Sequence, residues 1–226
     1  MTETLLLAAI IVPCLIVAIV FHEVSHGWAA LALGDPTAKE QRRLSFNPIR
    51  HVDPFGTVIL PGMLYIVGAP PFGWAKPVPV NQRRLDNPRY GMMAVAAAGP
   101  AMNVLLATAG AIALGLLAVT MEPGMVSDTL LTGLQVFIMI NVVLALFNML
   151  PVPPLDGSHI VEGLLPRSLA RHYGAVRKYG FVLLIGLLLA DWYLFGRFLV
   201  RHVVEPPVMW MMGEFIGIAE WVAALV

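Results

Sequence analysis

Two histidines and a glutamate stand close together in an otherwise apolar stretch of this sequence. Residues 22–26 read His-Glu-Val-Ser-His, and residues 5–21 before them contain no charged side chain. In a helix, His22 and His26 lie about one turn apart and project from the same face, so both imidazoles can bind one Zn²⁺. Glu23, one position along, can reach a water molecule on that ion. These residue types and this spacing indicate hydrolytic metal chemistry.

The apolar setting of this motif adds to its significance. Ionisable side chains are costly inside a membrane-length apolar segment, and by default they mark a functional site there. The neighbours on both sides of residues 22–26 are mostly Leu, Ile, Val and Ala, so the solvated polar face of a soluble helix is a poor explanation. A metal-free polar cluster packed between helices is the alternative to a metal site.

The composition is that of a membrane protein. The sequence has 226 residues, of which 58% are hydrophobic and 12% charged, and its mean hydropathy is +0.79. These values are typical of a polytopic membrane protein. The net charge of zero argues against nucleic acid as a partner. The single cysteine, Cys14, excludes an internal disulfide and a cysteine metal cluster.

We predict one all-α membrane domain over residues 1–226, with a core at 5–200 and a C-terminal apolar helix at 205–226. The expected helices are 5–33, 90–119, 129–150, 179–200 and 205–226, of which four or five cross the membrane. The first would be about 44 Å long at about 1.5 Å per residue, which exceeds a hydrocarbon core of about 30 Å. It must therefore tilt or protrude.

Residues 58–80 are expected to form a re-entrant or short β segment. Prolines and glycines interrupt residues 58–71, which are too short to span a bilayer. Residues 73–81 should be extended because prolines alternate with β-branched valines.

The basic residues predict the topology. All Lys and Arg except Arg197 and Arg201 lie in segments 39–50, 76–89 and 167–178, while the 121–128 turn has none. By the positive-inside rule these segments are cytoplasmic. The prediction places the N-terminus outside and the histidine motif towards the cytoplasmic side of the membrane.

A catalytic zinc usually takes three protein ligands plus water, so the two histidines need a third partner. Asp156 is favoured because prolines at 151, 153 and 154 end the preceding helix, and non-helical backbone at membrane depth normally lines a cavity or is buried. Asp156 could instead cap the next helix. The full set of candidates is His51, Asp53, Asp156, His159, Glu162 and Asp191.

Residues 147–157 read Phe-Asn-Met-Leu-Pro-Val-Pro-Pro-Leu-Asp-Gly. Together with the upstream His-Glu-x-x-His, this string resembles the site-2 protease family of intramembrane zinc metalloproteases. Segments 47–57, 76–81 and 99–103 also resemble compact bacterial members, those without a PDZ-like or regulatory domain. The matches cover residues 20–160 in the family's order.

The resemblance implies specific roles for residues of this chain. One Zn²⁺ per chain would be held by His22, His26 and Asp156, with Glu23 as the catalytic glutamate. Zinc lowers the pKa of bound water from about 15.7 to about 7, and Glu23 would move the proton to the leaving nitrogen. Asn148 would stabilise the oxyanion, a donor role worth about 3 kcal/mol, or else bridge helices.

Two further residues are candidates for substrate contacts. Asn103 could bind substrate or pack helices, and His51 could assist the site. The turn-forming pairs Asn47-Pro48 and Asp53-Pro54 flank His51 and suggest a loop role for this stretch. We also expect that residues 58–71 and 73–81 hold an unwound substrate by strand addition.

The sequence therefore predicts a zinc-dependent endopeptidase that cleaves single-span transmembrane proteins within the lipid bilayer. The resemblance suggests an anti-sigma factor or a signal-peptide remnant as substrate. One alternative is a zinc transporter, which would need ionisable residues along a path through the helices. The other is a non-catalytic zinc-binding scaffold, which would have no need of Glu23.

Overall fold

Most of the described part of the chain is helical. The computed structural model describes residues 2–66, 68 and 73–226, and side chains from residue 5 onwards. The α-helices in this part are α1 (Thr2–Ala32), α2 (Thr37–Glu40), α3 (Leu60–Ile66), α4 (Pro88–Thr120), α5 (Met125–Asn148), α6 (Asp156–Leu164), α7 (Arg167–Val176), α8 (Gly180–Tyr193) and α9 (Glu205–Leu225). Short 3₁₀ or π turns occupy Pro48–His51, Pro54–Ile59, Gln82–Arg84, Arg177–Tyr179 and Val200–Val204.

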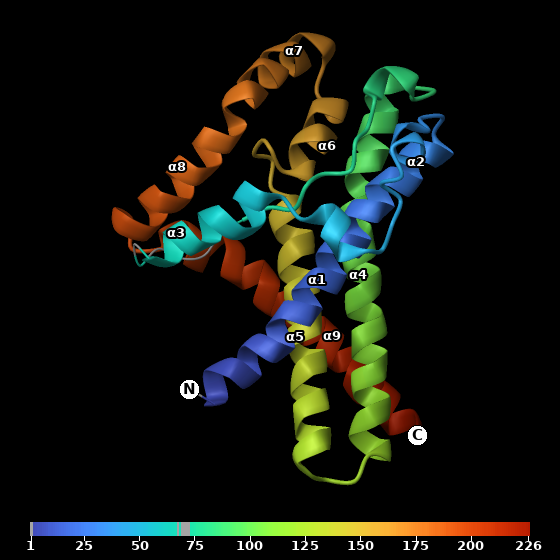
Figure 1. The fold of residues 1–226 in the computed structure, drawn as a ribbon, viewed down its shortest axis with the longest axis vertical. Helices are drawn as coiled ribbons and strands as arrows, with labels where there is room; N and C mark the ends of the chain where they lie inside the picture. Colours follow the sequence, from blue (N-terminus) through green and yellow to red (C-terminus); the bar gives the residue numbers. More distant parts are fainter. Residues whose placement is uncertain (1, 67, 69–72) are drawn as a thin grey trace.

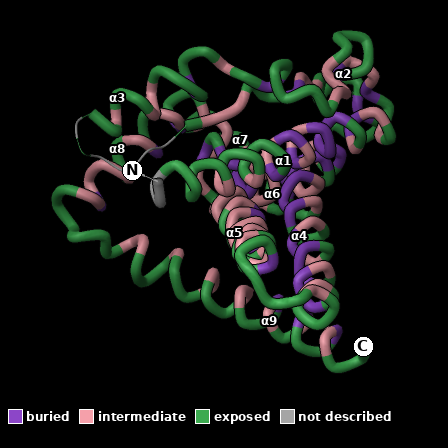
Figure 2. Tube along the Cα trace, turned by 60° about the horizontal axis from the view of Figure 1, so that its bottom comes forward, coloured by how far each residue is buried: buried purple, intermediate pink, exposed green. Residues whose placement is uncertain are grey.

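Five of the described helical segments are long and apolar enough to cross a membrane, which confirms the all-α polytopic prediction. They are Leu5–Ala32, Pro88–Thr120, Met125–Asn148, Arg167–Tyr193 and Val200–Leu225. The exposed residues along α8 and α9 are largely apolar, whereas the buried residues concentrate on the second half of α1 and along α4 (Figure 2). This distribution is typical of helices that face lipid outside and pack on one another inside.

Helix α4 is the centre of the bundle and packs against α1, α5, α6 and α9. Its buried face is rich in alanine and glycine, which let neighbouring backbones approach. A Cβ on Gly115 would lie 2.3 Å from the Ala219 carbonyl oxygen, so α9 can cross α4 only at a glycine. The apolar core between α4, α5 and α9 is Ala107, Ala111, Leu114, Ile138, Val142, Phe215 and Ala219.

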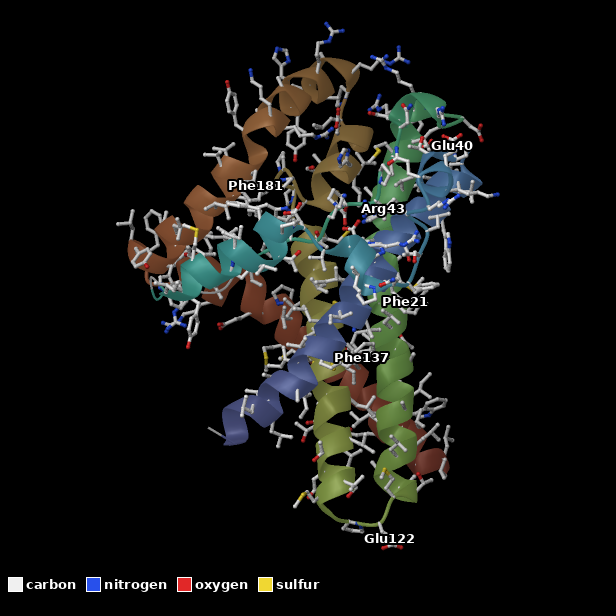
Figure 3. The ribbon with its side chains drawn as sticks, in the orientation of Figure 1. Phe21, Glu40, Arg43, Glu122, Phe137 and Phe181 are labelled. Atoms are coloured by element: carbon white, nitrogen blue, oxygen red, sulfur yellow. The ribbon has the colours of Figure 1, made fainter. Side chains whose placement is uncertain are left out.

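The segments that carry most of the basic residues gather at one end of the bundle. Helices α2, α6 and α7 and the start of α4 lie at the upper end in Figure 1, and the turn between α4 and α5 lies at the opposite end. In Figure 3, Arg43 lies in the upper part of the molecule and Glu122 at its lower end.

The segment after Asp53 is helical where strands were one expectation. Asp53 accepts hydrogen bonds from the amides of Phe55 and Gly56 at 3.0 and 2.7 Å, which starts the π turn Pro54–Ile59 and then α3. The turn-forming role of Asp53-Pro54 is thus confirmed. Residues 2–66, 68 and 73–226 contain no strand, so the short β prediction is wrong for the described part of 58–80. Residues 67 and 69–72 of that prediction lie outside the described residues.

The fourth predicted helix ends earlier than expected, and another helix precedes it. Residues 167–178, predicted as a basic loop, form α7 and the following turn, and the helix ends at Tyr193 rather than near residue 200. Its apolar and basic residues alternate with helical periodicity, which stabilises an amphipathic helix despite the charge. Positive φ angles at Gly196 (59°) and Arg197 (65°) then break the chain. The buried Asp191 carboxylate accepts from the amides of Leu199 and Val200 and holds that break in place.

Candidate metal centre

Three side chains from two distant parts of the sequence converge at one point. The Nε2 atoms of His22 and His26 lie 3.1 Å apart, and Asp156 Oδ2 lies 3.1 Å from the first and 3.4 Å from the second. Both histidines are buried. Within the described chain, no other group of three or more His, Cys, Asp or Glu side chains is close enough to share an ion.

Asp156 reaches the histidines because the chain folds back sharply after α5. Asp156 is the first residue of α6, and the residue before it, Leu155, is extended. A Cβ on Gly157 would lie 2.2 Å from the Met149 carbonyl oxygen, so only glycine fits at this return. The Asp156 side chain does not cap α6. The capping alternative therefore fails, and the carboxylate points across to α1.

Gly99 of α4 makes room for the two imidazoles. A Cβ at this position would lie 2.5 Å from the Cε1 and Nε2 atoms of His26 and 2.6 Å from Cε1 of His22. Carbon atoms in contact lie about 3.5 Å apart or more, so any side chain at this position would occupy the space of the histidines.

The other nitrogen of each imidazole is held by an oxygen. His22 Nδ1 lies 2.6 Å from Asn103 Oδ1, and His26 Nδ1 lies 2.7 Å from the carbonyl oxygen of Val95. Because these oxygens only accept hydrogen bonds, each Nδ1 carries the proton. The lone pairs of both Nε2 atoms are therefore available at the point of convergence, as a metal ligand requires.

The three donors fit a zinc ion. Ligand atoms at about 2.0–2.1 Å from a tetrahedral ion lie about 3.3 Å from one another, close to the observed separations. Asp156 Oδ2 is buried and has no hydrogen-bond partner among the described residues, as expected of an atom reserved for a cation. Two nitrogens and one carboxylate leave a fourth position open for water or substrate.

Glu23 belongs to the same region but is not one of the three donors. Its Oε2 accepts a hydrogen bond of 2.8 Å from the amide of Val78 in the segment 73–81. Pro77 and Pro79 flank Val78 and have no N–H, so Val78 provides the only amide donor of the three. One carboxylate oxygen is thereby held in place.

The remaining predicted residues occupy different surroundings. Asn148 is half-buried and donates from Nδ2 to the Leu144 carbonyl oxygen at 3.0 Å. His51 is buried, with Nε2 2.7 Å from the Ser45 carbonyl oxygen, and it is not part of the group that could share an ion. Asn103 is fully buried behind His22. Substrate contacts by Asn103 and His51 stay predictions.

His159, three residues after Asp156, was a candidate for the third ligand. Burial and the positive charge of Arg177 lower the pKa of His159 to about 4, so its imidazole is neutral at pH 7. It does not belong to the group that could share an ion.

Several parts of the site were not predicted from the sequence. The Val95 carbonyl and the Val78 amide are backbone groups, and because every residue has such groups, the residue type does not indicate their role. Gly99 opens the segment 99–103 that resembles the family, but no local pattern shows that it faces the imidazoles. Asn141, which hydrogen-bonds to Asn103, did carry a signal, because it is a polar residue in an apolar helix two turns before Asn148.

Comparisons with known proteins give matches over most of the chain. Residues 115–190 match Peptidase family M50. "Putative zinc metalloprotease YwhC" of Bacillus subtilis (strain 168) is 42% identical over 182 residues, which cover 78% of this chain and 78% of the relative. "Putative zinc metalloprotease Rip2" of Mycolicibacterium smegmatis is 25% identical over 174 residues, 77% of this chain and 64% of the relative. No solved structure gives a significant match.

Proposed function

Because the chain belongs to Peptidase family M50 and is a zinc metalloprotease, we propose that it cleaves single-span transmembrane proteins within the lipid bilayer. The observation that carries this proposal is the position of the convergent donors. His22 and His26 lie inside the span Leu5–Ala32, and both are buried among helices. A protease whose ligands lie on a membrane-spanning helix meets its substrate at membrane depth.

The ligands we assign are His22, His26 and Asp156, and the proton carrier is Glu23. A zinc ion held there supplies Lewis-acid activation of water and of the scissile carbonyl at neutral pH. With Oε2 held by the Val78 amide, Glu23 takes the proton of the attacking water on Oε1. The same oxygen then delivers the proton to the leaving amide nitrogen.

Asn148 is the residue we assign to the developing oxyanion. Its side-chain amide has two N–H groups, and one of them donates to the Leu144 carbonyl. The second N–H is the donor for the substrate carbonyl oxygen as it gains negative charge. The hydrogen bond to Leu144 keeps the amide oriented, so little reorganisation accompanies the reaction.

The segment 73–81 is the surface on which we place the unwound substrate. The amides of Trp74 and Lys76 bond inward to the carbonyls of Gly56 and His51, and the Val78 amide bonds inward to Glu23. Residues alternate sides along an extended chain, so residues 75, 77 and 79 belong to the opposite edge. Two of these three are prolines, which have no N–H. The carbonyls of this edge can therefore accept hydrogen bonds from a substrate strand, but the edge has almost no N–H groups to donate.

The distribution of charge supports an orientation with the site towards the cytoplasm. The segments with most of the basic residues share one end of the bundle (Figure 1), and by the positive-inside rule that end is cytoplasmic. The N-terminus would then be outside, in a bacterial cytoplasmic membrane. Candidate substrates are an anti-sigma factor or a signal-peptide remnant.

The decisive experiment compares the wild type with Glu23→Gln on a purified single-span substrate in liposomes. The variant should keep one zinc per chain and lose cleavage by about 10²–10⁴-fold, the usual contribution of a proton carrier. Mass spectrometry of the products should place the cut inside the apolar segment of the substrate. Equal cleavage by both proteins would overturn the catalytic assignment, and cuts confined to water-exposed loops would overturn intramembrane cleavage.

A further inference from the structure

A buried asparagine in the middle of α5 has no place in the mechanism described so far. Asn141 is completely inaccessible to solvent, as is its partner Asn103 on α4. An amide in the interior of a membrane bundle must find hydrogen bonds there, because no water is available to replace them. The partners of Asn141 connect it to the metal centre.

The bonds form a directed chain of three side chains. Asn141 Nδ2 donates to the Phe137 carbonyl oxygen at 2.8 Å, and Asn141 Oδ1 accepts from Asn103 Nδ2 at 2.9 Å. Asn103 Nδ2 also donates to the Ala18 carbonyl oxygen at 3.2 Å. Asn103 Oδ1 lies 2.6 Å from His22 Nδ1.

Each amide in this chain can face only one way. The backbone carbonyl of Phe137 cannot donate, so it fixes Nδ2 of Asn141 towards itself and turns Oδ1 towards Asn103. Asn141 Oδ1 and the Ala18 carbonyl oxygen both accept hydrogen bonds, so the Nδ2 atom of Asn103 must face them. Oδ1 of Asn103 must then face His22, which therefore carries its proton on Nδ1.

A reversed Asn103 amide would have the opposite effect on the metal centre. Its Nδ2 would face His22 Nδ1 and favour the tautomer with the proton on Nε2, the atom that converges with His26 and Asp156. A protonated Nε2 cannot bind a metal ion. The direction of one amide therefore decides whether His22 can act as a ligand.

We propose that Asn141 is a positioning residue of the metal centre, which acts through Asn103 to keep the Nε2 atom of His22 unprotonated and aimed at the ion. The proposal rests on the assignment of His22 as a zinc ligand. Its rival is that Asn141 only joins α4 to α5, as asparagines in membrane helices often do.

Two substitutions that match each other in shape separate these roles. In Asn141→Thr, the hydroxyl can donate to the i−4 carbonyl, as threonines in helices do, and its oxygen can still accept from Asn103. Asn141→Val has the same shape and offers neither bond. Ile138→Ala is the packing control, since Ile138 is fully buried between α4 and α5 one turn away and has no polar atom in its side chain.

The zinc dissociation constant of the full-length protein is measured in detergent, by competition with a chromophoric chelator. The melting temperature and the absorption spectrum of the Co²⁺-substituted form are measured alongside it. Asn141→Val should weaken zinc binding by about 10-fold or more, the lower end for losing a partner of a metal ligand, and alter the Co²⁺ spectrum. Asn141→Thr should stay close to the wild type. Ile138→Ala should lower the melting temperature without changing zinc affinity.

Wild-type zinc affinity in Asn141→Val, alongside a large loss in His22→Ala, would overturn the proposal and leave the metal site standing. Unchanged affinity in His22→Ala would overturn the ligand assignment and the proposal with it. If Asn141→Val does not fold, Asn141→Ala and Asn141→Ser form the equivalent pair, and equal zinc affinities of these two would refute the proposal in the same way.

Discussion

The sharpest prediction concerns Gly99, where a single methyl group should disable the metal centre. In Gly99→Ala the new Cβ would lie 2.5 Å from His26 Nε2 and Cε1 and 2.6 Å from His22 Cε1. Atoms in contact lie about 3.5 Å apart, so the imidazoles or the helix must move by about 1 Å. Overpacking of this size costs about 1–3 kcal/mol of stability.

The loss of function should exceed the loss of stability. A displacement of about 1 Å at a reacting centre can cost about 10²-fold in rate. It also breaks the match between the donor separations and a tetrahedral ion. We therefore expect Gly99→Ala to fold, with a modest drop in melting temperature, but to bind zinc at least about 10-fold more weakly and to cleave substrate at least about 10²-fold more slowly.

The assay is zinc content by elemental analysis, cleavage of a single-span substrate in liposomes, and thermal unfolding, all on the same preparation. Gly133→Ala on α5 is the matched control, because its Cβ would meet nothing closer than Ile10 Cγ2 at 3.9 Å. That control should behave like the wild type in all three assays. Full zinc occupancy and normal cleavage in Gly99→Ala would refute the argument that α4 packs directly on the zinc-binding imidazoles.

Two further predictions follow from the loops that support the site. Gly157→Ala places a Cβ 2.2 Å from the Met149 carbonyl oxygen, so Asp156 should shift and zinc affinity should fall by at least about 10-fold; unchanged affinity in a folded variant would contradict the role of this turn. Asp35 is fully buried and accepts from the hydroxyl and the amide of Thr37 and from the amide of Asn81. Burial raises its pKa, but these hydrogen bonds prevail and lower the pKa below the usual value. The ionised form should therefore contribute about 1–3 kcal/mol above about pH 4, and this contribution should disappear as the pH falls through the lowered pKa. The difference in melting temperature between the wild type and Asp35→Asn should narrow from pH 7 towards pH 3, and a difference that is constant with pH would count against it.

Much of this protein was readable from short stretches of the sequence. The apolar runs predict the membrane helices because each helix satisfies its own backbone hydrogen bonds and must match the bilayer in length. The histidine spacing needs only one turn of one helix. The prolines before Asp156 indicate a break at membrane depth. Each of these inferences depends on residues that are neighbours along the chain.

The errors arose where local composition was ambiguous. The basic segment 167–178 looked like a loop, yet its periodicity is that of an amphipathic helix. Residues 58–66 were expected in a re-entrant or short β segment, but the hydrogen bonds of Asp53 start a helical segment there. In both cases composition and charge favoured a non-helical segment, but capping or helical periodicity produced a helix.

The tertiary structure decided everything that lies between helices. Gly99 has room for no side chain because α4 crosses α1 at the histidines, and Val95 holds His26 only through its backbone. The Val78 amide meets Glu23 because a distant loop returns across α1. The sequence determined which side chains could bind zinc, since that depends on residue type and spacing. Which atoms hold those side chains in a binding tautomer depends on how helices cross, and a crossing leaves no local pattern in the chain.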